Sequence, residues 1–250
     1  MDNSLLVSLS HQIAAYRAMD VIANNIANAS TPGYKRESAK FEEYVAQMPL
    51  GEGQAANQAS SQQVSFVKDA GITRDTGQGP LGQTGNPFDL ALNGKGFFVV
   101  QTPQGPRYTR DGHFSLDANG QIVNSSGYVL QGDGGAITIT PDDGDIRIAP
   151  DGTVSGRTGQ LAKVRVADFG NEDAMVKEGA NLYSTTQTAV TPQVVDIRQG
   201  ALESSNVQPV LEISRMIEVM RAYEATSTLS KNQQDMRTDA IGKLGAMPSA

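Results

Sequence analysis

Apolar residues near the N-terminus recur with the spacing of a helix. Successive members of the set stand three or four residues apart, or a sum of these: Leu6, Leu9, Ile13, Tyr16, Ile22 and Ile26. This spacing places them on one face of an amphipathic helix. Pro32 lacks a backbone donor and Gly33 turns the chain at little steric cost, so the helix is expected to end near Ala29.

The same period returns at the C-terminus. Its apolar positions are Val210, Ile213, Ile217, Met220, Leu229, Met236, Ile241 and Leu244. They predict a second helix, interrupted by the polar residues 226–230, with Pro209 suited to its first turn. We therefore assign residues 1–30 and 207–246 to a terminal helical domain.

Between these segments the period changes to two. Ile137 and Ile139, Ile146 and Ile148, and Val164 and Val166 are pairs separated by one residue, which is typical of strands. Turn signals at 93–96, 111–112 and 119–120 predict hairpins. We interpret residues 81–206 as an antiparallel β domain with one buried face, and residues 31–80 as an extended connector that includes a mobile loop at 51–63.

The predicted fold class is mixed and mainly β. An antiparallel β domain lies between N- and C-terminal amphipathic helices, which pack together as a coiled-coil-like pair and hide each other's apolar stripes. Two helices form a thin core, so we expect assembly through the termini. We also expect the helices to order only on assembly, because a thin stripe barely offsets the backbone entropy lost on ordering.

Three asparagines lie in the last turns of the first helix. One interpretation is C-terminal capping and a solvated face; the other is a polar seam that bonds neighbouring copies of the helix. With the second interpretation, the predicted assembly interface contains Leu9, Ile13, Asn24, Asn25, Asn28, Ile213, Ile217, Met220 and Tyr223.

Composition and motifs argue against other functions. A net charge of -7 disfavours nucleic-acid binding. The acidic turns 142–145 and 151–152 lack the spacing of a calcium loop, and no phosphate loop occurs. Cysteine is absent, and the two histidines lack partners for a metal site or a catalytic triad. We therefore predict no catalytic residue, cofactor or metal. Arg107, Arg110 and Asp111 suggest a surface ion pair, or a contact that orients the β domain against a neighbour.

Targeting signals are equally sparse. The first thirty residues contain no basic region followed by an apolar core, and no run is long enough for a membrane helix. This pattern is expected of a cytoplasmic protein, and equally of one secreted without a cleaved signal.

Three stretches resemble one protein family. Residues 23–36 read Ala-Asn-Asn-Ile-Ala-Asn-Ala-Ser-Thr-Pro-Gly-Tyr-Lys-Arg, residues 85–100 and 107–114 form a central block, and residues 205–207, 216–217 and 221–224 form a C-terminal block. In this order they resemble the flagellar axial proteins, the rod and hook family of the bacterial flagellum. The size of the chain, its single β domain and its Met1-Asp2-Asn3 start are most similar to proximal rod subunits.

The resemblance implies a structural, non-enzymatic subunit of the basal-body rod. Such subunits stack helically, with copies of themselves and with other proximal and distal rod proteins, into a hollow drive shaft that crosses the periplasm and transmits torque. It also implies passage, unfolded and without a cleaved signal peptide, through the flagellar type III export apparatus. The alternatives are a distal rod protein or, less favoured, a periplasmic β-domain glycan-binding or hydrolytic protein.

Overall fold

The computed structural model describes residues 2–49, 61–192 and 194–245. The chain divides into two compact units. The helical unit contains Met1–Ile26, Glu37–Thr73 and Gln208–Ala250, and the β unit contains Ala27–Arg36 and Arg74–Val207.

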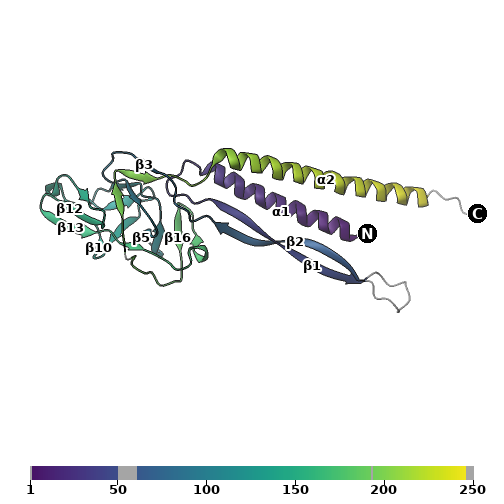
Figure 1. Cartoon of the computed structure of the whole chain (residues 1–250), viewed down its shortest axis with the longest axis horizontal. Coiled ribbons are helices and arrows are strands. Elements are labelled where there is room, and N and C mark those ends of the chain that lie inside the picture. The colour runs from purple at the N-terminus through teal and green to yellow at the C-terminus, as the bar shows by residue number, and fades with distance from the viewer. Residues whose placement is uncertain (1, 50–60, 193, 246–250) are drawn as a thin grey trace, which may run out of the picture. The chain divides into compact units, whose positions relative to one another are not determined.

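The helical unit contains the two predicted helices. Helix α1 (Asp2–Ala27) and helix α2 (Pro209–Gly245) run antiparallel and side by side (Figure 1). Helix α2 is continuous through residues 226–230, where we predicted an interruption. The hydroxyl of Thr226 donates a hydrogen bond of 2.9 Å to the carbonyl of Ala222, so this polar side chain is satisfied within the helix.

Two long strands replace part of the connector predicted at residues 31–80. Strands β1 (Glu37–Pro49) and β2 (Ser61–Arg74) form a two-stranded sheet within the helical unit. Of the loop predicted at 51–63, residues 61–63 belong to β2 and the rest lies outside the described residues. The alternation of Phe41, Glu42, Glu43 and Tyr44 was too irregular to indicate a strand from the sequence.

The β unit is built on a nine-stranded sheet, which confirms the mainly antiparallel β domain. The strand order is β15-β16-β6-β5-β9-β8-β7, with β10 paired to β9 and β14 paired to β5. The strands are β5 (Phe97–Thr102), β6 (Gly105–Thr109), β7 (Phe114–Leu116), β8 (Ile122–Asn124), β9 (Val129–Gly132), β10 (Gly135–Ala136), β14 (Val166–Ala167), β15 (Val176–Lys177) and β16 (Leu182–Ser184).

Smaller sheets complete the unit. Strands β11 (Arg147–Ile148), β12 (Thr153–Gly156) and β13 (Gly159–Lys163) form one sheet. Strand β17 (Ile197–Gln199) pairs with β4 (Leu90–Leu92), and β18 (Ala201–Glu203) pairs with β3 (Leu81–Gln83). Two short 3-10 turns, η1 (Pro141–Asp143) and η2 (Glu172–Ala174), lie between strands.

The central strand β5 is buried on both faces. Phe98 and Val100 join the larger core cluster, whereas Phe97 and Val99 join a second cluster with Phe169 and other residues. The prediction of a single buried face is therefore wrong for this strand. Its uninterrupted run of four large apolar residues is typical of a strand covered on both sides.

The turn residues in the sequence predicted where the chain bends more reliably than they predicted which strands form hairpins. The turn at 119–120 joins β7 to β8, which pair as predicted. The turn at 93–96 joins β4 to β5, yet β4 pairs with β17. The turn at 111–112 joins β6 to β7, which do not pair with each other. A turn residue fixes where the chain bends, while burial of the flanking side chains decides which strands pair.

The acidic turn at 142–145 is a structural feature held by threonines. Asp143 is buried, and its carboxylate accepts hydrogen bonds from the Thr158 hydroxyl at 2.6 Å, the Thr140 hydroxyl at 2.7 Å and the Thr140 amide at 2.8 Å. The bond from Thr158 contributes most to lowering the pKa of Asp143 below its ordinary value.

We expect Asp143→Asn to lower the melting temperature of the β unit at neutral pH. A depressed carboxyl pKa stabilises the fold above its unfolded value near 3.8 and ceases to do so as the pH falls through the folded pKa. The difference between the variant and the parent chain should therefore shrink at acidic pH, as thermal denaturation at several pH values will measure. A difference that grows on acidification would contradict this account.

Candidate functional site

Helix α1 carries its large apolar side chains on its exposed side. Leu5, Leu9, Ile13 and Tyr16 are 38%, 50%, 61% and 62% exposed. At about 100° per residue they lie roughly opposite the side of α1 that bears the alanines and the buried residues near its C-terminal end. We call Leu5, Leu6, Leu9, Ile13 and Tyr16 the outer row of α1.

Helix α2 has a comparable exposed face. Val210, Ile213, Ile217 and Met220 are 76%, 48%, 42% and 46% exposed, and they lie within about 80° of one another around the helix. Tyr223, which we placed with them, is half-buried. The prediction that the two helices hide each other's stripes is therefore wrong, since most of both stripes is exposed and, of the α1 stripe, only Ile22 is buried and Ile26 half-buried.

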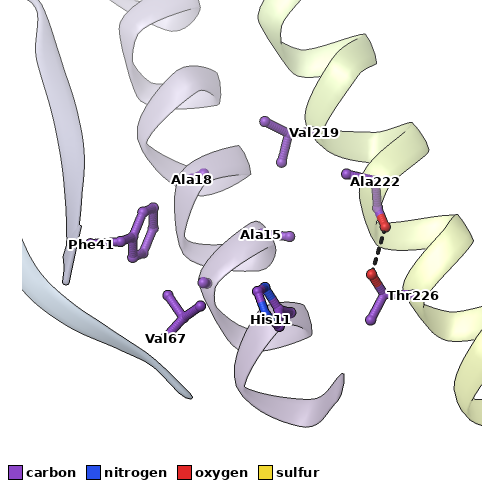
Figure 2. Close-up of a pocket in the computed structure, with 9 residues that line it drawn as sticks. His11, Ala15, Ala18, Phe41, Val67, Val219, Ala222 and Thr226 are labelled. Carbon is purple, nitrogen blue, oxygen red and sulfur yellow. Dashed lines mark hydrogen bonds between the residues drawn. The ribbon is translucent and has the colours of Figure 1, made fainter. Parts of the chain in front are cut away.

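Small side chains explain how the helices can meet without covering these rows. Ala15 of α1 and Val219 and Ala222 of α2 point into the space between the helices (Figure 2). This space is a groove of about 290 Å³, which is also lined by His11, Ala14, Ala18, Phe41, Val67 and Thr226. The packing inside the helical unit thus uses mainly small residues and leaves the large ones outside.

The three asparagines have different positions. Asn24 is exposed, Asn28 is half-buried, and Asn25 is fully buried. The Asn25 amide donates to the Glu37 carbonyl at 2.7 Å and to the Glu212 carboxylate at 3.1 Å, and its oxygen accepts from the Glu37 amide at 2.9 Å. Asn25 is therefore not available to a neighbouring copy: it joins α1, β1 and α2 within the helical unit.

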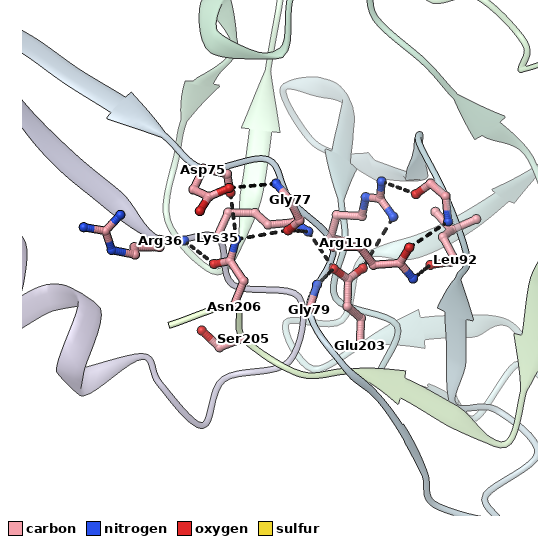
Figure 3. A network of polar contacts seen from close by, with 12 residues as sticks. Lys35, Arg36, Asp75, Gly77, Gly79, Leu92, Arg110, Glu203, Ser205 and Asn206 are labelled. Carbon is pink, nitrogen blue, oxygen red and sulfur yellow. Dashed lines mark hydrogen bonds and ion pairs between the residues drawn. The ribbon is translucent and has the colours of Figure 1, made fainter. Parts of the chain in front are cut away.

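A buried ionic cluster lies in the β unit, and sequence reasoning missed it. The Lys35 ammonium contacts Glu203 Oε1 at 2.5 Å, and Arg110 Nη1 contacts Glu203 Oε2 at 3.4 Å (Figure 3). Exposure of the Lys35, Arg110 and Glu203 side chains is 4%, 3% and 1%. Burial lowers the pKa of Lys35, and the attraction of Glu203 partly offsets that effect.

Arg110 was predicted at the surface with Arg107, and only Arg107 is there. Arg107 pairs with Glu178 at 2.5 Å, and that carboxylate is 39% exposed. Arg110 is buried instead, where it donates to the Gly94 carbonyl at 2.6 Å and lies over the Phe97 ring at 5.4 Å. A sequence gives no sign of this difference, because the acidic partner of Arg110 is 93 residues away.

Among the described residues, the histidine and acidic side chains form no metal-binding group, and His113 is not part of a catalytic triad. No group of three His, Asp or Glu side chains among them is placed to hold a metal ion. His113 Nδ1 lies 2.9 Å from the buried carboxylate of Asp89, whose other oxygen accepts from the Thr84 hydroxyl at 2.6 Å. The hydroxyl thus contacts the carboxylate and not the imidazole, unlike the nucleophile of a triad. None of the described helices combines the length and apolar character needed to cross a membrane.

Three family models match the chain in sequence order. Residues 5–35 match the flagella basal body rod protein model, residues 91–156 match the D1 domain of flagellar hook protein FlgE/F/G, and residues 198–242 match the C-terminal region of flagellar basal body rod FlgEFG proteins. The flagellar basal-body rod protein FlgF of Caulobacter vibrioides is 43% identical over 98% of this chain and 99% of its own length. The chain belongs to the flagellar basal-body rod protein family.

Other members of the rod family are similar over the whole chain. FlgF of Mesorhizobium japonicum is 36% identical over 98% of this chain and 99% of its own length. FlgG of Buchnera aphidicola from Schizaphis graminum is 34% identical over 96% of this chain and 99% of its own length. The chain is accordingly a structural rod subunit of the flagellar basal body, and the family is not enzymatic.

The buried ionic cluster takes one residue from each matched region of this rod protein. Lys35 ends the first region, Arg110 lies in the second and Glu203 lies in the third. The outer row of α1 lies in the first region and the exposed face of α2 in the third. The family regions therefore contain both the exposed helical faces and the cluster.

We expect Asn25→Ala to destabilise the helical unit by about 1–3 kcal/mol, because the Glu37 backbone groups lose a buried partner. Urea denaturation followed by far-UV circular dichroism will measure this loss. Asn232→Ala, at an exposed position of α2, is the control and should change stability little. Equal effects of the two substitutions would contradict the structural role of Asn25.

Glu203→Gln should destabilise the β unit by about 3–5 kcal/mol, because it leaves two buried cations without their carboxylate. Near-UV circular dichroism of the tyrosines during urea denaturation will measure it. The matched control is Glu178→Gln, which breaks the more exposed pair with Arg107 and should cost much less. A loss at Glu203 no larger than that at Glu178 would refute the importance of the cluster.

Proposed function

We propose that this rod subunit assembles by burying the outer row of α1 and the exposed face of α2 against neighbouring subunits. The observation that carries the proposal is the inverted packing of α1, with alanines toward α2 and large apolar residues toward solvent. Contiguous apolar surface of this kind marks interaction sites in soluble proteins. Full burial of one such side chain contributes about 1.5–3 kcal/mol.

The two exposed faces also suit an open assembly. The outer row of α1 contains three leucines, an isoleucine and a tyrosine, whereas the face of α2 contains one valine, two isoleucines and a methionine. Contacts between two different faces of identical chains generate rings or helical filaments rather than closed dimers. A helical stack of such contacts, made with copies of the chain and with other rod proteins, would form the hollow shaft that transmits torque.

We place the subunit in the proximal rod. Two FlgF proteins are 43% and 36% identical to the chain, above two FlgG proteins of Buchnera aphidicola at 34% and 35%, although FlgF of Rhizobium meliloti is 32% identical. The single β unit and the chain length support the same position. A position in the distal rod is the alternative, and cross-linking to identified rod proteins distinguishes the two.

Export and ordering complete the proposal. The subunit is expected to cross the inner membrane unfolded through the flagellar export apparatus, without a cleaved signal peptide, and to act in the periplasm without nucleic acid or a small-molecule substrate. Among the described residues of α1, Val21 and Ile22 are the large apolar side chains that are buried. This small core supports our expectation that the helices gain full order only on assembly.

Ile13→Asp tests the interface directly. The side chain is 61% exposed, so we expect the stability of the subunit to change by less than about 0.5 kcal/mol. In a strain that lacks the parent gene, the variant should yield at least about tenfold fewer complete basal bodies, since tenfold corresponds to about 1.4 kcal/mol. Electron microscopy of isolated basal bodies and swimming assays will measure this.

Ile13→Met is the matched control, because it keeps an apolar side chain of similar volume and should support normal assembly. A photo-crosslinker at Ile13 should in addition join this chain to rod subunits. Normal rods from Ile13→Asp, or crosslinks confined to one chain, would overturn the proposal.

A further inference from the structure

Three segments of the β unit meet where the chain passes to and from the helical unit. The chain changes unit after residues 26, 36, 73 and 207. Residues 33–36, 75–79 and 203–206 adjoin three of these points, and they are bonded to one another (Figure 3). We call these residues, together with Arg110, the junction.

Asn206 bonds to both of the other segments. Its Oδ1 accepts from the Arg36 amide at 2.7 Å, and its Nδ2 donates to the Asp75 carbonyl at 2.9 Å and to the Gly77 carbonyl at 3.0 Å. Backbone bonds run in parallel, with the Asp75 amide donating to the Arg36 carbonyl at 2.8 Å. One side chain therefore fixes the spacing of all three segments.

Lys35 makes the same connection from the buried side. Its ammonium donates to the Gly77 carbonyl at 2.9 Å and to Glu203, and Glu203 also accepts from the Gly79 amide at 2.9 Å. The Gly33 amide donates to the Glu203 carbonyl at 2.8 Å. Like Asn206, Lys35 bonds to both of the other segments, and its charge is paired inside the unit.

The backbone in the junction is packed without spare room. A Cβ on Gly79 would lie 1.9 Å from the Ser204 carbonyl oxygen, and a Cβ on Gly33 would lie 2.4 Å from the Arg110 backbone. Gly33 also has a φ of +68°, which favours glycine. The segments therefore cannot slide past one another without breaking buried polar contacts, which are costly to leave unpaired.

We infer that the junction is the joint through which the β unit exchanges force with the rest of the rod, and that Lys35 and Asn206 are positioning residues of that joint. The inference rests on the proposed function. Force along the chain must enter the β unit through its covalent crossing points, and connections between units are flexible by default. Here three crossing points are tied together by hydrogen bonds, of which those of the Glu203 carboxylate are buried and those of Asn206 are partly or fully exposed, and we expect the three segments to move together.

The use of charged side chains in the junction supports a positioning role and not only a stabilising one. Desolvation of Lys35, Arg110 and Glu203 is expensive, and well-packed apolar residues often stabilise a fold equally well. Ionic and amide contacts instead require particular directions and partners. Contacts that form only in one geometry help to keep the three segments of the junction in place when force is applied.

The test compares Lys35→Met and Asn206→Ala in the full-length chain. Lys35→Met leaves Arg110 and Glu203 as a balanced pair, so the β unit should keep a single cooperative unfolding transition. Amide hydrogen exchange in residues 31–36 and 75–79 should become at least tenfold faster in both variants. Lys35→Arg should restore slow exchange in part, and Asn119→Ala, at an exposed turn, should leave exchange in these segments unchanged.

The functional readout is swimming in media of increasing viscosity, combined with crosslinking from Ile13. We expect both variants to retain the Ile13 crosslinks between rod subunits and yet to lose at least half of their speed relative to Asn119→Ala at high viscosity. Unchanged hydrogen exchange, or unchanged swimming speed at high viscosity, would contradict the proposed role of the junction. If the Ile13 crosslinks were still present in that case, the assembly proposal would stand. Absence of Ile13 crosslinks in the parent rods would overturn the assembly proposal, and the joint with it.

Discussion

The structure of the β unit depends on keeping Glu203 paired while it is 1% exposed. A carboxylate removed from water needs close cations and donors, and here Lys35, Arg110 and the Gly79 amide supply them. These groups come from the segment after α1, the end of β6 and the segment before β3. Satisfying one charge therefore fixes the start, middle and end of the β unit relative to one another.

The helical unit follows the opposite rule. Its described internal contacts include alanines, the bonds of Asn25 and the carboxylate of Glu212, while most of the large apolar residues on its helices are exposed. Apolar burial is thus unevenly divided between the units: the β unit has two apolar clusters of its own, whereas much of the apolar surface of the two helices is exposed. Local stability in proteins commonly varies in this way.

The sequence predicted the two helices and the β domain, but it missed strands β1 and β2 and gave poor predictions of which elements pack together. The period of Leu9 and Ile13 identified α1, and Pro32 with Gly33 identified its end, because these signals are local. The inward side of α1 is the side that bears the small residues Ala14 and Ala18. A hydrophobic pattern gives these alanines less weight than leucine, so it pointed to the wrong side of the helix. The burial of Lys35 could not be predicted from the sequence, because its partner Glu203 is 168 residues away and no local signal reports such a partner.

The two units therefore use different kinds of interaction: the helices expose apolar surface, and the junction in the β unit uses charged and amide contacts. Apolar contacts are non-directional and scale with buried area, which suits the exposed helical faces that we propose to pack against neighbouring subunits. Buried charges and amides are directional and tolerate little displacement, which suits the segments through which the chain enters and leaves the β unit. If the junction were held by apolar contacts instead, its segments could shift relative to one another. If the helical faces were charged and directional, they would fit neighbours in only one orientation. Placing large apolar residues on the exposed side of α1 and charged and amide side chains in the junction avoids both problems.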